Sequence, residues 1–208
     1  MKIGILNESN DQRVSLVPNV LKKLEGLDVD FLVEKGAGEQ ASISDQDFKA
    51  MAKVVNRSTL LSESEMLISV QPPEEEILQQ LSKDTLLISM FAPYQDDSIV
   101  GQLEKYGLRA VSMDMIPRTT LAQSMDILSS MASIAGYKAV LTAANHLPRY
   151  FPMMITAAGS IRPAKVLVLG AGVAGLQAIA TAKRLGSMVE AFDVRSAAKE
   201  EVESLGAK

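Results

Sequence analysis

Short apolar runs alternate with segments of helical periodicity along most of this chain of 208 residues. Runs such as KIGIL at 2–6 and TLLISM at 85–90 have the length of buried strands, and helical patterns lie between them. Strands that alternate with helices imply right-handed βαβ units, which build a parallel sheet covered by helices. The alternation therefore predicts an α/β fold, with a first α/β domain over residues 1 to about 115.

The other elements of this first domain are predicted in the same way. Further strands are expected at 31–34, 66–70 and 108–113, and helices at 19–27, from Ser44 onward, at 74–81 and at 97–106. Ser44 and Asp47 have the spacing of a capping box, which favours a helix start at this point.

Charge and composition exclude several functional classes. The chain has 21 basic and 25 acidic residues and a net charge of −4, without the basic stripe that a nucleic-acid surface needs. It has no cysteine, so disulfides and thiol chemistry are excluded. No run of about 18 apolar residues occurs, so no membrane-spanning helix is expected. The apolar start ends at Leu6, too early for a secretion signal, and no metal site is predicted.

A glycine-rich motif, G-x-G-x-x-G, lies at residues 170–175. Gly170 lets the chain turn sharply out of a strand, and Gly172 leaves the backbone open to a pyrophosphate. Gly175 lets the following helix pack closely on the strand. Val173 and Ala174 complete the predicted cofactor-binding turn, whose helix N-terminus offers free N–H groups to phosphates.

The sequence around the motif has the order that a dinucleotide site requires. A strand at 165–170, a helix at 176–185 and a second strand at 187–193 surround the glycines, and the second strand ends in Asp193. An acid in this position accepts hydrogen bonds from a ribose and repels a 2′-phosphate, which favours NAD(H) over NADP(H). Arg195 is also predicted in the site, either beside a phosphate or flanking the adenine.

Residues 117–130, PRTTLAQSMDILSS, interrupt the α/β rhythm with a polar stretch. Helical spacing begins at about Ser124 and is expected to continue through Ala144, so this long helix is predicted to connect two domains. The only histidine, His146, follows the helix, where a surface or capping role is expected.

Several of these segments together resemble a known family. The glycine motif with DVR at 193–195, and PRTTLAQSMDILSSMASIAGYKAV at 117–140, resemble the NAD(H)-binding component of proton-translocating nicotinamide nucleotide transhydrogenase. GILNESNDQRVSLVPNVLKKL and FLVEKGAGEQASISDQDF resemble the opening that this component shares with alanine dehydrogenase. The resemblance covers essentially the whole chain, and the segment at 117–140 is its most specific portion.

The resemblance implies a reacting site in the polar loop. Arg118 and Ser129 would orient the nicotinamide carboxamide, Gln123 would reach toward a partner's nucleotide, and Asp126 would hold the loop and ring in place. Direct hydride transfer needs positioning and exclusion of water rather than a general base, and these polar residues fit that need. Leu121 stands where many relatives have a second basic residue, which is expected to loosen the loop or its partner contact.

The resemblance also implies partners and a location. The enzyme would be a proton-translocating, Re/Si-specific NAD(P)⁺ transhydrogenase, with NAD(H) on this chain and NADP(H) on a partner domain. A transmembrane proton-channel component would be the second partner, and the chain would form a homodimer. It would lie at the cytoplasmic face of the membrane, or at the matrix face in a mitochondrion.

Two alternatives remain open. Alanine dehydrogenase needs an arginine, a lysine and a histidine in its pocket; Arg13 matches the first, but Gln71 stands at the expected lysine and SMFAPY at 89–94 has no histidine. A non-catalytic NAD-binding module is the other alternative.

The predicted domains are residues 1–120, an α/β domain, 121–150, the polar loop and connector helix, and 151–208, the start of a Rossmann NAD(H)-binding domain. Such a domain usually has five or six parallel strands, whereas residues 163–208 supply two. The second domain is therefore expected to be incomplete, as in a fragment or one piece of a split polypeptide.

Overall fold

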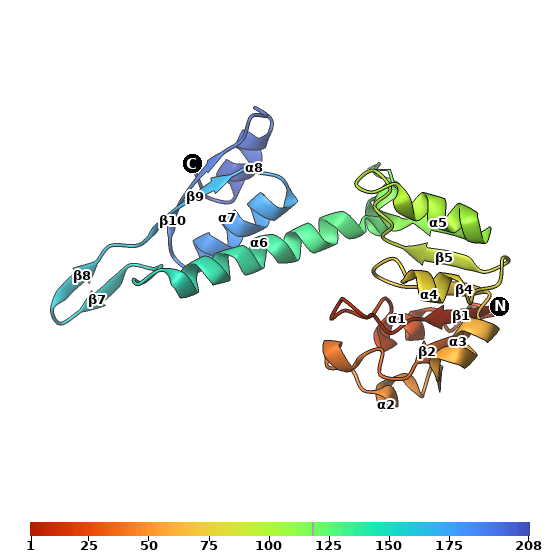
Figure 1. Ribbon diagram of the computed structural model, residues 1–208. Helices are drawn as coiled ribbons and strands as arrows, with labels where there is room; N and C mark the ends of the chain where they lie inside the picture. The colour runs from red at the N-terminus through yellow and green to blue at the C-terminus, as the bar shows by residue number, and fades with distance from the viewer. Residues whose placement is uncertain (118) are drawn as a thin grey trace. The chain divides into compact units, whose positions relative to one another are not determined.

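The computed structural model describes residues 1–117 and 119–208 (Figure 1). These residues divide into two compact units, Met1–Met125 and Asp126–Lys208. Each unit has its own parallel strands and its own hydrophobic core. The predicted α/β class is confirmed, and the contacts group residues 126–146 with the second unit. The domain boundaries at residues 120 and 150 stay predictions.

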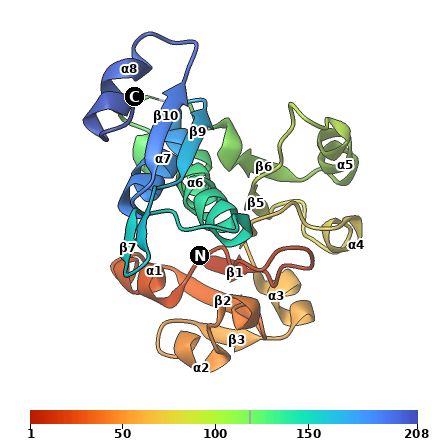
Figure 2. The same ribbon diagram turned by 90° about the vertical axis from the view of Figure 1, so that its left-hand side faces the viewer.

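Six parallel strands form the sheet of the first unit. They are β1 (Lys2–Ile5), β2 (Asp30–Glu34), β3 (Lys53–Val55), β4 (Met66–Ile68), β5 (Leu86–Ser89) and β6 (Arg109–Ser112). Their order is β3-β2-β1-β4-β5-β6, and Figure 2 shows β3 and β6 at opposite edges. β1 pairs with both β2 and β4, so the order of strands reverses between β1 and β4. Ligands of such sheets usually bind at the carboxyl ends of the strands beside this switch point.

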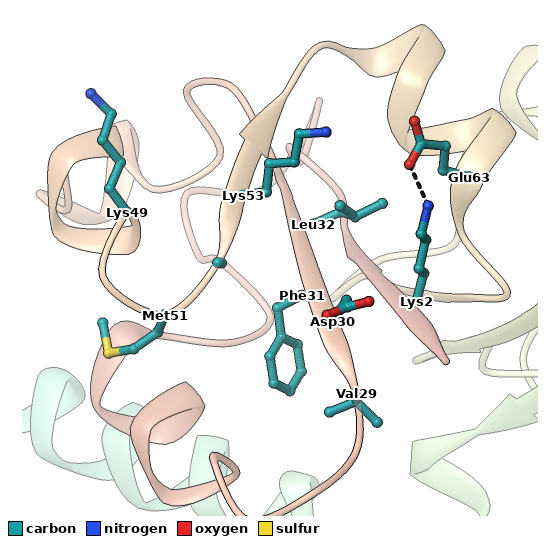
Figure 3. A pocket seen from close by; sticks show the side chains of 10 residues that line it. Lys2, Val29, Asp30, Phe31, Leu32, Lys49, Met51, Lys53 and Glu63 are labelled. Carbon is teal, nitrogen blue, oxygen red and sulfur yellow. Dashed lines mark hydrogen bonds and ion pairs between the residues drawn. The ribbon is translucent and has the colours of Figure 1, made fainter.

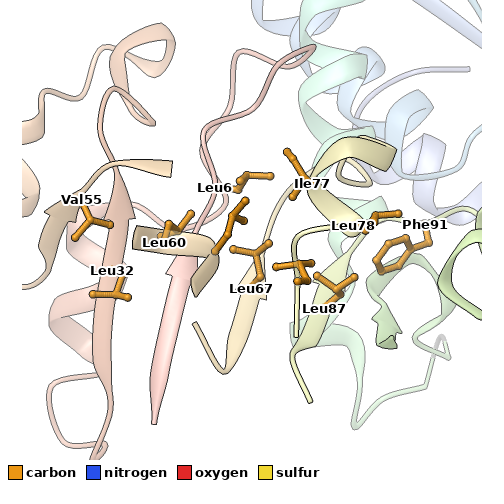
Figure 4. Close-up of a cluster of buried hydrophobic side chains, with 11 residues drawn as sticks. Leu6, Leu32, Val55, Leu60, Leu67, Ile77, Leu78, Leu87 and Phe91 are labelled. Carbon is orange, nitrogen blue, oxygen red and sulfur yellow. The ribbon is translucent and has the colours of Figure 1, made fainter. Parts of the chain in front are cut away.

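Helices cover both faces of this sheet. They are α1 (Pro18–Lys23), α2 (Asp45–Phe48), α3 (Arg57–Glu63), α4 (Glu75–Leu78) and α5 (Ser98–Tyr106), with 3₁₀ turns η1 (Glu39–Ala41), η2 (Met113–Met115) and η3 (Gln123–Met125). On one face, Ile5 and Val33 share a buried cluster with Phe48 of α2. On the other, Leu32 shares a cluster with Leu60 of α3, drawn in Figure 4. Alternate residues of a strand thus serve opposite faces, as a fully covered parallel sheet requires.

Local signals explain where the predicted elements were right and where they were wrong. The capping box at α2 is confirmed, since Ser44 N–H and Oγ both donate to Asp47. Helix α1 ends at Lys23 instead of continuing to Leu27, whose side chain is exposed. Strand β3 and helix α3 were not predicted, although the Asn56 side chain caps α3 by accepting from Thr59 N–H at 2.8 Å.

The second unit is built from helix α6 and a pair of parallel strands. Its elements are α6 (Ile127–His146), β7 (Met154–Thr156), β8 (Gly159–Ile161), β9 (Lys165–Leu169), α7 (Val173–Arg184), β10 (Met188–Phe192) and α8 (Ala198–Ser204). β9 and β10 pair in parallel, and β7 and β8 form an antiparallel hairpin that was not predicted. The core gathers Val140, Ile179, Val189 and Val202, from α6, α7, β10 and α8.

Helix α6 packs tightly along α7 (Figure 1). A Cβ atom at Gly136 would lie 2.0 Å from the carbonyl oxygen of Ala174, in the first turn of α7. The two helices therefore approach so closely at this point that only glycine fits at position 136.

Helix α6 also corrects one expectation from the sequence. It is the one helix among the described residues that is long and apolar enough to cross a membrane by length and composition. The sequence was expected to contain no such segment. The core helix of a globular domain can meet the same criteria; α6 packs against α7, but only 11% of its apolar window is buried within the described residues.

Candidate functional site

The glycine turn connects β9 to α7, as the motif predicted. Gly170 follows the strand with φ of +95°, a conformation that favours glycine. A Cβ atom at Gly175 would lie 1.8 Å from the Gly170 carbonyl oxygen, so the helix start rests directly on the turn. A Cβ atom at Gly172 would have no neighbour within 4 Å among the described residues, which leaves its backbone open to a ligand.

Helix α7 begins inside the motif. Its first residue is Val173, rather than Leu176 as predicted, so Val173, Ala174 and Gly175 form its first turn. The first N–H groups of a helix have no partner within the helix, and Gly172 at the N-cap has no side chain to bind them. These donors, at the positive end of the helix dipole, can bind a phosphate group. The turn therefore fits the pyrophosphate of a dinucleotide.

Asp193 lies beside this turn, directly after β10. Its carboxylate accepts a hydrogen bond from Ala171 N–H at 2.7 Å, which ties the second strand to the glycine turn. Arg195 binds the same carboxylate through its backbone N–H at 2.8 Å and its Nε at 3.0 Å. The Arg195 guanidinium and the backbone N–H groups hold the pKa of Asp193 well below its usual range. Asp193 is therefore an ionised acceptor at neutral pH.

The structure describes three of the four predicted loop residues and places them in two segments. Arg118 lies outside the described residues, and Gln123 is exposed in η3, at the end of the first unit. Asp126 is the N-cap of α6, where its carboxylate accepts from Ser129 N–H at 2.9 Å and from Ser129 Oγ at 2.6 Å. Two of the four predicted residues therefore contact each other directly at the start of one helix.

A second polar cluster lies at the switch point of the first sheet. Glu8 accepts from Val70 N–H at 2.6 Å and Gln71 N–H at 3.2 Å, and burial raises the pKa of its carboxyl. Arg13 donates to Asp11 through Nε at 2.9 Å and Nη2 at 2.6 Å, and Gln71 Nε2 donates to Asp11 at 3.1 Å. The Arg13 guanidinium holds the pKa of Asp11 well below its usual range.

This cluster offers little room for a substrate. The hollow lined by Glu8 and Gln71 has a volume of about 30 Å³, enough for one or two water molecules. Arg13, which was expected to line an alanine dehydrogenase pocket, pairs instead with Asp11 of the same chain. His146 is exposed at the end of α6, with Nδ1 2.8 Å from the Thr142 carbonyl oxygen.

A larger hollow, of about 530 Å³, lies at the amino ends of β1, β2 and β3 (Figure 3). Lys2, Lys49 and Lys53 line it together with Glu63, whose carboxylate is 2.7 Å from Lys2 Nζ. This edge of the sheet is opposite to the usual ligand crevice. None of the predicted site residues lines it.

Two structural contributors to the site were not recognised in the sequence. Gly136 supports the first turn of α7 by its close contact with Ala174, but a glycine inside a helix gives no sign of its neighbour. The pairing of Arg195 with Asp193 was also missed, because the sequence left open whether Arg195 faces a phosphate or the adenine. The sequence DVR at 193–195 shows that the two residues are close in the chain, but it does not show where either side chain points.

The fold and the glycine turn define the class of this protein: it is an α/β protein of Rossmann type, with the glycine turn that is typical of dinucleotide-binding domains. Residues 4–135 match the family described as "Alanine dehydrogenase/PNT, N-terminal domain", and residues 139–208 match the corresponding C-terminal domain. The chain belongs to the alanine dehydrogenase/PNT family.

Within this family the chain is more similar to transhydrogenases than to alanine dehydrogenases. It is 45% identical to a Rhodospirillum rubrum protein named as the first portion of NAD(P) transhydrogenase subunit alpha, over 100% of this chain and 56% of that protein. A transhydrogenase structure from Sinorhizobium meliloti has a TM-score of 0.95 and 43% identity, covering 100% of this chain and 63% of that one. An L-alanine dehydrogenase structure has a TM-score of 0.85 and 28% identity, covering 99% and 58%. The chain thus spans little more than half the length of the Rhodospirillum relative.

Proposed function

We propose that this chain is the NAD(H)-binding component of a proton-translocating, Re/Si-specific NAD(P)⁺ transhydrogenase. The glycine turn carries the proposal, because it joins open backbone at Gly172, the free N-terminus of α7 and an ionised acid at Asp193. The identity of 45% to the Rhodospirillum subunit supports transhydrogenase over other members of the family.

The residues of the second unit would bind one end of the nucleotide. The first N–H groups of α7 would bind the pyrophosphate, and Asp193 would accept from the adenosine ribose. Because Asp193 is negatively charged, it disfavours the 2′-phosphate of NADP(H). When bound, NAD(H) supplies or accepts the hydride, so the chain needs to bind, orient and exclude water rather than to transfer protons.

The polar loop would hold the reacting end. We assign the carboxamide to Arg118 and Ser129, contact toward the partner's nucleotide to Gln123, and positioning of the loop to Asp126. The hydrogen bonds from Ser129 to Asp126 support the positioning role, because they fix both side chains at the first turn of α6. Such fixed geometry is what direct hydride transfer requires.

The proposed partners are an NADP(H)-binding domain and a transmembrane component that conducts protons. The chain would act as a homodimer on the cytoplasmic face of the membrane, or on the matrix face in a mitochondrion. The name of the Rhodospirillum relative, which describes one portion of an alpha subunit, supports an assembly of several components.

Calorimetric titration with NADH and NADPH tests the proposed cofactor. We expect NADH to bind about tenfold or more tightly than NADPH, and Asp193→Asn to reduce this preference by removing the negative charge. Absence of NADH binding, or tighter binding of NADPH, would contradict the proposal.

Alanine dehydrogenase activity is the competing function within the family. The small hollow beside Gln71, which stands where the lysine of that enzyme is expected, argues against a pocket for a 2-oxo acid. We therefore expect no pyruvate- and ammonium-dependent oxidation of NADH, measured by its absorbance. Such oxidation at a rate above the background would favour the alanine dehydrogenase function.

A further inference from the structure

The carboxylate of Asp193 already has a full set of hydrogen bonds. Oδ2 accepts from Ala171 N–H at 2.7 Å and Arg195 Nη2 at 3.1 Å, and Oδ1 accepts from Arg195 N–H at 2.8 Å and Arg195 Nε at 3.0 Å. A carboxylate has about four lone-pair positions for acceptance. A ribose hydroxyl can therefore bind Asp193 well only if one of these four donors leaves.

Two of the donors are fixed and two are free to move. The N–H groups of Ala171 and Arg195 belong to the backbone of the turn and the loop, so they stay in place. The other two belong to the Arg195 side chain, which is 60% exposed, whereas the Asp193 side chain is 11% exposed. Arg195 Nη2 also donates to the Ala171 carbonyl oxygen at 3.2 Å, so the guanidinium closes over the edge of the turn.

The structure offers a place for the guanidinium after its release. A hollow of about 370 Å³ lies between the end of β10 and α8, and both Asp193 and Arg195 line it. Glu203 lines the same hollow together with Lys199 and Lys208, and Glu203 Oε1 lies 3.8 Å from Lys199 Nζ. Asp193 is the main cause that raises the pKa of Arg195, and the charge of Glu201 adds to it. Rotation about the side-chain bonds of Arg195 would move the guanidinium into this hollow.

We propose that Arg195 competes with the ribose for Asp193, and that this competition helps to set the preference between NAD(H) and NADP(H). The inference rests on the proposed function, in which the second unit binds the adenosine end of NAD(H). Without nucleotide, Arg195 neutralises Asp193 and covers its oxygen atoms. After release, its positive charge lies near the ribose and offsets some of the repulsion of a 2′-phosphate.

The first unit contains a similar acid that shows how a permanent pairing is built. Glu34 ends β2, as Asp193 follows β10, and accepts from Asn7 N–H at 2.9 Å and Arg57 Nε at 2.7 Å. Arg57 lies on helix α3, 23 residues from Glu34, and joins distant segments of the unit. Arg195 is only two residues from Asp193, and its side chain reaches one other segment, the glycine turn, where Nη2 donates to the Ala171 carbonyl oxygen at 3.2 Å. Because the Arg195 side chain is mostly exposed, water can replace its hydrogen bonds when the pairing opens.

The test compares Arg195→Ala with Arg184→Ala, which removes the same charge from an exposed position at the end of α7. Affinities for NADH and NADPH are measured by fluorescence at constant ionic strength. Exposed ion pairs are weak, so we expect Arg195→Ala to raise the NADH-to-NADPH affinity ratio by about two- to fivefold. Because the competitor for Asp193 is removed, the NADH affinity is expected to rise in Arg195→Ala, and Arg184→Ala is expected to leave the ratio unchanged.

A ratio that is the same in both variants would overturn the inference, as would an equal loss of affinity for both nucleotides in Arg195→Ala. The second result would mean that Arg195 only holds the site in shape. Failure of the unsubstituted protein to bind either nucleotide would contradict the proposed function, and the inference with it.

A measurement without nucleotide tests whether Arg195 pairs with Asp193 in solution. The carboxyl carbon of Asp193 is followed by NMR as the pH is lowered. Because Arg195 supplies the largest stabilisation of the ionised form, we expect the pKa of Asp193 to rise toward its usual value in Arg195→Ala. An unchanged pKa would mean that the pairing does not form in solution, which also overturns the inference.

Discussion

At the scale of single residues, the three glycines of the turn have different physical roles. Gly170 has a positive φ, Gly175 touches the carbonyl oxygen of Gly170, and Gly172 faces open space. The first and third are therefore required by the fold itself. Gly172 is required only if a ligand approaches the backbone, so a substitution at this position tests ligand binding.

A pair of alanine substitutions separates these roles. Gly175→Ala should lower the free energy of unfolding by about 1–3 kcal/mol, because its Cβ cannot fit beside the turn without a backbone shift. Gly172→Ala should change stability by less than about 0.5 kcal/mol, because its Cβ meets no neighbour among the described residues, yet it should weaken NADH binding. Urea unfolding and NADH titration measure both effects. Unchanged NADH affinity in Gly172→Ala would show that the pyrophosphate does not approach this turn.

At the scale of elements, α6 packs against the start of α7. Asp126 caps α6 at one end, and Gly136 two to three turns later permits the contact with Ala174. Since Ala174 lies in the first turn of α7, the position of α6 affects the N–H groups that would bind phosphate. The long helix is therefore a support of the glycine turn in addition to its expected role as a connector.

Glycine-to-alanine substitution in two helices tests this contact. Alanine favours a helix over glycine by about 1 kcal/mol, so Gly101→Ala in α5, where a Cβ atom meets no described neighbour, should stabilise the first unit. Gly136→Ala should instead destabilise the second unit by about 1–3 kcal/mol, because its Cβ would collide with the Ala174 backbone. Amide hydrogen exchange in α5 and α7 reports on each unit separately. Slower exchange in α7 of Gly136→Ala would refute the close contact.

At the scale of the whole molecule, the two units both contain parallel strands, six in the first unit and one pair in the second, but they carry different polar groups. The first has the strand order of a dinucleotide-binding sheet, but a polar network of Glu8, Asp11, Arg13 and Gln71 occupies its switch point. The second carries the glycine turn. The α/β class and the turn were predictable, because buried strands have a distinct length and because glycine is favoured at the backbone positions of Gly170 and Gly175.

Other features could not be read from the sequence, for physical reasons. β7 and β8 are three residues each, too short for a periodic pattern, and Ala157-Ala158 between them is no recognisable turn signal. Helix α7 was predicted to start too late, because its first residues belong to the glycine motif and resemble a loop. The contact of Gly136 with Ala174 and the pairing of Arg195 with Asp193 depend on tertiary packing and side-chain direction, which spacing does not encode.

Transfer of an isotope between the two nucleotides distinguishes a transhydrogenase component from a non-catalytic NAD-binding module. NADH deuterated at C4 of the nicotinamide is mixed with NADP⁺, this protein and an NADP(H)-binding transhydrogenase partner, and NADPH is analysed by mass spectrometry. Direct hydride transfer predicts deuterium in NADPH only when both proteins are present, with no exchange of the label into water. Binding of NADH without deuterium in NADPH would contradict the account, and would favour a non-catalytic NAD-binding module.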